Sequence, residues 1–145
     1  IISYRDFLDE MRPELLAQEI TSFGDFYAGT ADKIFRTGKD IWIIDLKTSQ
    51  SIWPEHELQI SSYSHMNFNY KKMGISDKEW QNRRLAVLQI GYKKNKKGYK
   101  FTEVEDKYHL FQNAYKIWKN ENPDIKPKER DYPSVIFSKF RRNKS

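Results

Sequence analysis

The most constraining feature of this chain is residues 28–49, AGTADKIFRTGKDIWIIDLKTS, which are typical of two β-strands joined by a turn at Gly38. Alternate side chains of a strand point to opposite faces. One face of the second strand is apolar and consists of Trp42, Ile44 and Leu46. The other face carries Ile43 and then Asp45 and Lys47. This pattern predicts a sheet strand that presents a carboxylate and an ammonium group on one face at its C-terminal end.

Asp32 lies in the first of these strands, and a turn near Gly38 would bring it level with Asp45. Hard cations such as Mg²⁺ bind one or two carboxylates and keep positions for water and phosphate. Lys47 could then hold an attacking water or a scissile phosphate. Glu19, on the preceding predicted strand, is a candidate third carboxylate. Spacing alone leaves open a second interpretation, in which Lys47 forms a structural ion pair with Asp45 or Asp32.

The hydrophobic periodicity predicts further strands and helices around this hairpin. We expect helices over residues 3–12, from about Glu55 to Lys72 and over 106–120, and strands over 15–22, 25–36, 40–48, 84–92 and 99–105. The second helix should carry four residues on one face: Gln59, Tyr63, Met66 and Tyr70. Strands interleaved with helices indicate an α/β fold with a central mixed sheet flanked by helices.

With 145 residues and 38% hydrophobic residues, the chain fits one compact domain, residues 1–145, with a basic C-terminal tail over 123–145. Its start at IISYRDF, without an initiator Met, leads us to expect that an N-terminal segment is missing. No apolar run reaches the ~20 residues of a membrane-spanning helix. The net charge of +6 weakly favours an anionic partner, and the absence of cysteine excludes disulfides, zinc–thiolate sites and iron–sulfur clusters.

Several short motifs follow one another along the chain. They are Glu19, GTAD with Asp32, IIDLKTS with Asp45 and Lys47, and LQISSY with Gln59 and Tyr63. In this order, between about Leu15 and Met66, the chain resembles the PD-(D/E)xK nuclease superfamily, and within it the RecB-like and phage-type exonucleases. Two features of some relatives are missing: an upstream histidine ligand and a cysteine-bound iron–sulfur cluster.

The resemblance implies a restriction-endonuclease-like fold and a Mg²⁺- or Mn²⁺-dependent hydrolysis of DNA phosphodiesters, exonucleolytic rather than endonucleolytic. The roles that it implies are these: Asp32, Asp45 and the Leu46 backbone carbonyl bind metal, Lys47 is the catalytic lysine, Glu19 assists the metal or the water, and Gln59 and Tyr63 contact the substrate backbone. We also expect Thr48, next to this motif, to contact substrate. Ordinary helix packing remains the alternative for Gln59 and Tyr63.

The basic segment YKKNKKGYK, residues 92–100, is predicted to be the tip of the later hairpin. Its lysines, Lys93, Lys94, Lys96 and Lys97, are candidates for contacts with DNA phosphates, although a surface turn needs no such function. A non-catalytic nucleic-acid-binding or recombination-scaffold domain with the same fold is the alternative function, and a sequence-preferring endonuclease is a third. We expect DNA as the partner, no membrane, and a location inside a bacterial or phage-infected cell, with oligomeric state and any larger complex left open.

Overall fold

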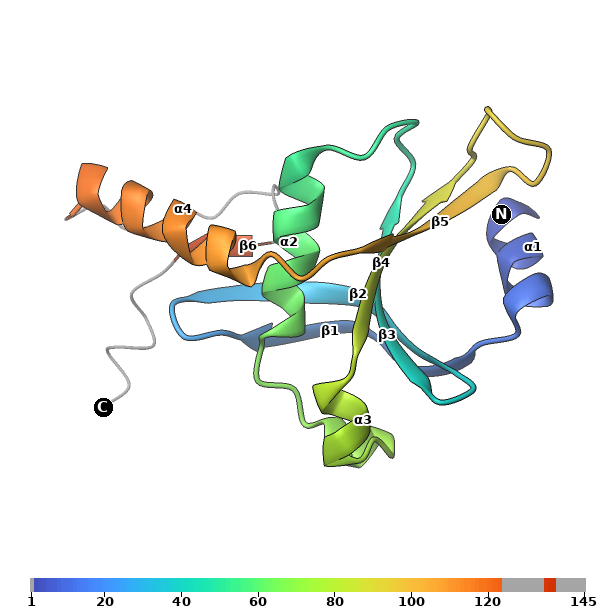
Figure 1. Ribbon diagram of the computed structural model, residues 1–145, viewed down its shortest axis with the longest axis horizontal. Coiled ribbons are helices and arrows are strands. Elements are labelled where there is room, and N and C mark those ends of the chain that lie inside the picture. The colour runs from blue at the N-terminus through green and yellow to red at the C-terminus, as the bar shows by residue number, and fades with distance from the viewer. Residues whose placement is uncertain (1, 124–134, 138–145) are drawn as a thin grey trace.

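The structure is a computed structural model that describes residues 2–123 and 135–137 (Figure 1). Its helices are α1 (Ile2–Met11), α2 (Pro54–Ser64), η1 (Tyr70–Met73, a 3₁₀ turn), α3 (Asp77–Gln81) and α4 (Tyr108–Glu121). Its strands are β1 (Glu14–Phe23), β2 (Tyr27–Thr37), β3 (Asp40–Lys47), β4 (Arg84–Ile90), β5 (Tyr99–Val104) and β6 (Val135–Phe137).

These strands form one mixed sheet in the spatial order β1-β2-β3-β4-β5, with β6 paired to β2. Strands β3 and β4 run parallel because α2 carries the chain back between them, and the other pairs are antiparallel. The predicted α/β class, a mixed sheet flanked by helices, is therefore confirmed. The expected hairpins β2–β3 and β4–β5 are also present, the first with Lys33 paired to Ile44.

Apolar side chains pack on both faces of the sheet. The cluster beneath α2 and α4 includes Ile34, Ile43, Ile60, Tyr63, Val87 and Phe111. The cluster beneath α1 includes Phe7, Phe35, Trp42, Ile44, Ala86 and Leu88. Strand β3 contributes alternate residues to each cluster, so it is the buried centre of the sheet. Burying a full Leu, Ile or Phe side chain is worth about 1.5–3 kcal/mol, so these two clusters hold β3 firmly in place.

Helix α2 ends at Ser64, and the predicted continuation to Lys72 is wrong. The hydroxyls of Ser61, Ser62 and Ser64 donate to backbone carbonyls three or four residues earlier, at 2.6–2.8 Å. Such bonds offer the backbone an alternative to the regular helix. Just beyond, the Asn67 N–H donates to the Phe23 carbonyl at 2.8 Å, which draws the chain to β1. Met66 and Tyr70 therefore do not extend the face that Gln59 and Tyr63 share.

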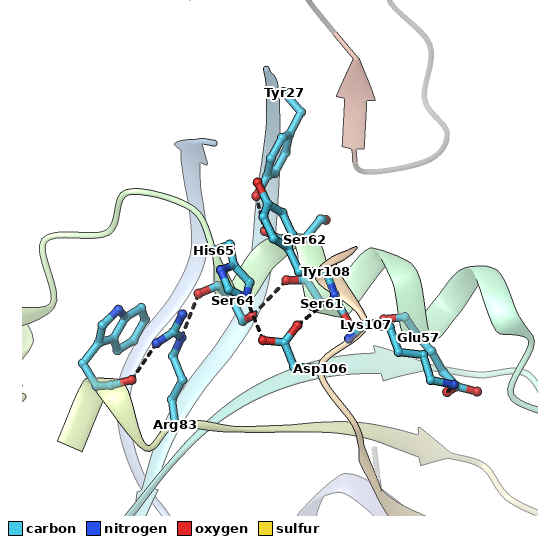
Figure 2. A network of polar contacts seen from close by, with 11 residues as sticks. Tyr27, Glu57, Ser61, Ser62, Ser64, His65, Arg83, Asp106, Lys107 and Tyr108 are labelled. Atoms are coloured by element: carbon cyan, nitrogen blue, oxygen red, sulfur yellow. Dashed lines mark hydrogen bonds and ion pairs between the residues drawn. The ribbon is translucent and has the colours of Figure 1, made fainter. Parts of the chain in front are cut away.

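A polar network fixes α2 to the strands and to the β5–α4 connection (Figure 2). Its side chains come from α2 and the residue after it, from β2, from Arg83 just before β4, and from residues 106–108. Two donors reach backbone carbonyls of the helix: Tyr27 Oη donates to Ser62 at 2.6 Å, and Arg83 Nε donates to Ser64 at 2.7 Å. His65 Nε2 contacts Asp106 Oδ2 at 2.6 Å. Lys107 makes two contacts, from its N–H to Ser61 Oγ at 2.9 Å and from Nζ to Glu57 Oε1 at 2.6 Å. The helix is thus held from several sides, which positions Gln59 over the sheet.

Helix α3 was not among the expected elements, although Ser76 and Glu79 form a capping box at its start. Strand β6 lies within the predicted basic tail, and residues 124–134 and 138–145 of that tail lie outside the described residues. Among the described residues, no helix combines the length and the apolar character needed to cross a membrane.

Candidate active site

Strand β3 delivers Asp45 and Lys47 to the face covered by α2. The preceding residue on that face, Ile43, packs in the α2 cluster, whereas Trp42 and Ile44 pack in the α1 cluster. The predicted alternation is therefore confirmed. Asp45 is only 3% exposed, so this carboxyl group is buried and does not lie at a solvated edge of the sheet.

Asp32 lies where β2 separates from β3. The two strands pair from Thr37 and Asp40 as far as Lys33 and Ile44, which leaves Asp32 next in line with Asp45. At this point the Leu46 N–H donates to Asp32 Oδ2 at 2.9 Å, so a side-chain carboxylate takes the place of a strand carbonyl. The turn at Gly38 thus brings the two aspartates together, as expected.

Burial raises the pKa of Asp45 to about 7. The adjacent Asp32 carboxyl raises this pKa further, and the charge of Lys47 only partly offsets the two effects. Lys47 Nζ lies 3.1 Å from Asp45 Oδ2 as an ion pair, yet no described group forms a hydrogen bond with that oxygen. Burial and the neighbouring Asp32 carboxyl group therefore disfavour ionisation of Asp45 more than Lys47 favours it.

Lys47 connects the sheet to α2. Its Nζ donates to Gln59 Oε1 at 3.1 Å, and its side chain is 24% exposed. The ammonium group therefore lies between the buried Asp45 and solvent, with Gln59 limiting its movement. This is the place that a group binding an incoming anion should occupy.

His56 also lies in this neighbourhood, on the first turn of α2. Its Nδ1 accepts the Trp53 N–H at 3.2 Å, and burial together with the charge of Lys47 lowers its pKa. The structure does not favour the predicted substrate contact of Tyr63, the other α2 residue of the motif. Its side chain is 1% exposed within the α2 cluster, so it packs the core and presents no surface to a substrate.

No family model, curated protein or solved structure matches this chain.

Glu19 is exposed on β1, opposite Asp32 in the register between the pairs Gln18–Lys33 and Ile20–Ala31. Its φ of 49° lies in the left-handed region, which is uncommon for a residue with a side chain and marks a local irregularity of the strand. Within the part of the chain that the structure describes, no three His, Cys, Asp or Glu side chains form a group that could hold a metal. The structure thus brings Asp32 and Asp45 together and leaves Glu19 outside the pair.

The remaining predicted residues lie beyond the end of β3 and on the β4–β5 hairpin. Thr48 is exposed, as are Lys93, Lys94, Lys96 and Lys97. Lys97 pairs with Glu10 of α1 at 3.3 Å, and therefore lies on the side away from α2. The hairpin lysines therefore do not all lie on the same side of the sheet.

Two glutamines near the site were missed by the sequence analysis. Gln89 is 2% exposed, pairs in register with Lys47, and donates through Nε2 to the Ser49 carbonyl at 3.0 Å. Gln50 joins the β3–α2 loop to the β4–β5 hairpin. The signal for Gln89 was available, because a single amide in the apolar run RLAVLQI resembles the single carboxylate in IWIIDL.

The residues present fit a divalent cation. Asp45 Oδ2 is buried without a hydrogen bond, and a carboxylate pair with hard oxygen donors is the set that Mg²⁺ and Mn²⁺ prefer. A strand residue directs its N–H and C=O to the same side. The Leu46 carbonyl should therefore lie on the side of Asp32, as its N–H does. Asp32, Asp45 and this carbonyl would hold the ion.

Proposed function

We propose that this protein is a divalent-metal-dependent DNA nuclease with a restriction-endonuclease-like fold, as its resemblance to the PD-(D/E)xK superfamily implies. The observation that carries the proposal is the convergence of Asp32, Asp45 and Lys47 on the α2 face of the sheet. Spacing alone allowed a structural ion pair instead. The Asp45–Lys47 ion pair of that interpretation is present at 3.1 Å, but it does not account for the second carboxyl group, Asp32, beside Asp45. Burial is the main cause that raises the pKa of Asp45, and Asp32 raises it further.

The chain's own residues have distinct parts in this proposal. Bound Mg²⁺ or Mn²⁺ would supply charge neutralisation at the phosphoryl group and favour deprotonation of the attacking water. Lys47 would orient that water or a non-bridging phosphate oxygen through its N–H donors, and Gln59 Oε1 keeps the ammonium group in place. The α2 cluster on one flank of Asp45 keeps bulk water away from the carboxyl pair.

Cleavage of DNA tests the proposal directly. Labelled linear and covalently closed circular DNA are incubated with Mg²⁺ or Mn²⁺ and the wild type, Asp45→Ala or Lys47→Ala. We expect the wild type to cut, and either variant to lose at least about 10²-fold in rate, the usual loss when one group that stabilises charge is removed. Cutting of linear but not circular DNA would support the exonuclease.

Asp40→Asn is a matched control, because Asp40 lies on the same strand but pairs with Arg84 at 3.0 Å, away from the carboxyl pair. It should cut as the wild type does. The proposal is wrong if the wild type leaves both DNA forms intact, or if the Asp45 and Lys47 variants cut as fast as Asp40→Asn. Binding of DNA without cleavage would favour the non-catalytic alternative.

A further inference from the structure

A row of polar side chains continues from Lys47 across the sheet. Lys47 pairs with Gln89 of β4, which pairs with Lys100 of β5, and paired residues of neighbouring strands share one face. With neighbouring strands about 4.8 Å apart, the backbone of Lys100 lies about 10 Å from that of Lys47. The face that carries the proposed catalytic lysine therefore ends in a second lysine on the edge strand.

A pocket of about 270 Å³ opens along this row, between the β3–α2 loop and the β4–β5 hairpin. Both segments project from the same end of the sheet (Figure 1). The pocket is lined by Gln50, Ser51, Ile52, Gln89, Tyr92, Lys94, Lys100 and Thr102. None of these lining residues is acidic, so the pocket is a cationic and polar site.

Glutamine side chains hold the two walls of this pocket together. Gln50 Nε2 donates to the Gly91 carbonyl at 3.0 Å, and Gln50 Oε1 accepts the Lys93 N–H at 2.9 Å. On the floor, Gln89 Nε2 donates to the Ser49 carbonyl. The loop that follows Lys47 is thus tied to the hairpin, which fixes the pocket relative to the proposed catalytic lysine.

The hairpin lysines divide between two sides of the sheet. Lys94 and Lys100 line the pocket, and Lys100 Nζ lies 5.6 Å from the centre of the Tyr92 ring. Lys96 and Lys97 line a separate hollow beside α1, where Lys97 pairs with Glu10 and which Lys100 also borders. Of these four lysines, Lys94 and Lys100 line the pocket beside Gln89, and Lys96 and Lys97 do not.

We propose that this pocket is a second phosphate subsite, in which Lys94 and Lys100 bind a phosphate of the same DNA strand whose scissile phosphate reaches Lys47. The inference rests on the proposed function for the choice of DNA as ligand. Phosphate contacts position a nucleic acid without reading its sequence. The subsite would hold the strand in register with the carboxyl pair.

Binding of a fluorescently labelled single-stranded oligonucleotide, followed by anisotropy in EDTA over a series of salt concentrations, tests the subsite. EDTA removes the metal, so the wild type can be used without cleavage. The double variant Lys94→Gln/Lys100→Gln should lower the slope of log K against log salt by about 0.7, because the two lysines bind one phosphate and each phosphate neutralised on a single strand contributes about 0.7. The matched control, Lys96→Gln/Lys97→Gln, removes two charges from the same hairpin and should keep most of the slope.

An oligonucleotide series in which one phosphate at a time is replaced by a neutral methylphosphonate locates the contact. At one position the replacement should weaken oligonucleotide binding by the wild type and by Lys96→Gln/Lys97→Gln. It should not further weaken binding by Lys94→Gln/Lys100→Gln, which already lacks the contact. The subsite would be overturned if the two double variants lost equal salt dependence of binding, or if Lys94→Gln/Lys100→Gln lost none. Thermal unfolding of the variants shows whether each is folded.

The subsite and the nuclease can fail separately. If the wild type does not cut DNA, but Lys94→Gln/Lys100→Gln weakens DNA binding and Lys96→Gln/Lys97→Gln does not, the subsite is supported and the catalytic proposal is wrong. If the wild type cuts DNA and both double variants bind it equally well, the subsite falls and the catalytic proposal stands.

Discussion

Replacement of Asp45 by Asn should make the protein less sensitive to alkaline pH. The folded-state pKa of about 7 lies above the ordinary aspartate value of 3.8, so the folded protein binds a proton that the unfolded chain releases. The resulting stabilisation is complete below pH 3.8 and is lost as the pH rises through about 7. Between pH 5 and pH 8 this loss amounts to about 3 kcal/mol, at 1.36 kcal/mol for each pH unit over which one proton is bound.

Asparagine has the same shape as aspartate and does not titrate, so Asp45→Asn avoids this loss. Urea denaturation in EDTA should therefore show the free energy of unfolding of the variant, relative to wild type, rising by about 3 kcal/mol from pH 5 to pH 8. Asp40→Asn, on the same strand, should show no such rise. A difference between Asp45→Asn and wild type that stays constant within 1 kcal/mol over this range would refute the assignment of a buried, proton-binding carboxyl pair.

Added Mg²⁺ extends the same experiment to the proposed metal site. A cation requires Asp45 to be ionised, so its affinity should rise with pH through about 7. At pH 8 and a concentration one hundred times its Kd, Mg²⁺ should stabilise the wild type by about 2.7 kcal/mol, and Asp45→Asn by much less. Equal stabilisation of the two proteins would mean that the ion binds elsewhere.

Three further substitutions test other parts of the structure by urea denaturation. Glu19→Gly should match the wild type or exceed it by up to about 1 kcal/mol, because glycine adopts a φ of 49° without the Cβ penalty; a clear loss of stability would show that Glu19 is held by favourable contacts. Thr102→Val should stabilise the protein by about 1 kcal/mol, since Thr102 Oγ1 is buried without a hydrogen bond. Thr30→Val is the control and should not stabilise the protein, because it loses a hydrogen bond to Thr21 at 2.9 Å. Asp106→Ala should cost at least about 1 kcal/mol, because Asp106 Oδ1 accepts the Tyr108 N–H at the start of α4 and Asp106 Oδ2 contacts His65 Nε2 at 2.6 Å. Asp106→Asn keeps an oxygen for the Tyr108 N–H and should retain part of that stability.

The site was predictable from the sequence where a strand pattern fixed it. Strict alternation in IWIIDLK determines that Asp45 and Lys47 share a face, and the turn at Gly38 determines that Asp32 lies level with Asp45. These statements depend only on residues adjacent in the chain or joined by a short turn. They were correct because the register of β3 with β2 and β4 is unbroken, so its side chains alternate regularly.

The errors occurred where distant contacts decide the outcome. Helix α2 stops at Ser64 because β1 and Arg83, just before β4, supply hydrogen-bond partners for the backbone there. The serine hydrogen bonds within SSYSHMNF do not by themselves show where the helix ends. The burial of Tyr63 likewise follows from the packing of α2 on the sheet. Strand β6 pairs with β2, which lies more than one hundred residues earlier in the chain. No local sequence signal next to β6 indicates this pairing.

The hydrogen bond from the Leu46 N–H to Asp32 has a consequence for tolerance to mutation. The position of this carboxylate is set by the main chain of β3 and not by the shape of its apolar neighbours. Substitutions that repack either hydrophobic cluster while preserving the β2–β3 pairing should leave the spacing between the two aspartates nearly unchanged. The interior of this protein can therefore diverge widely in sequence without dispersing the carboxyl pair.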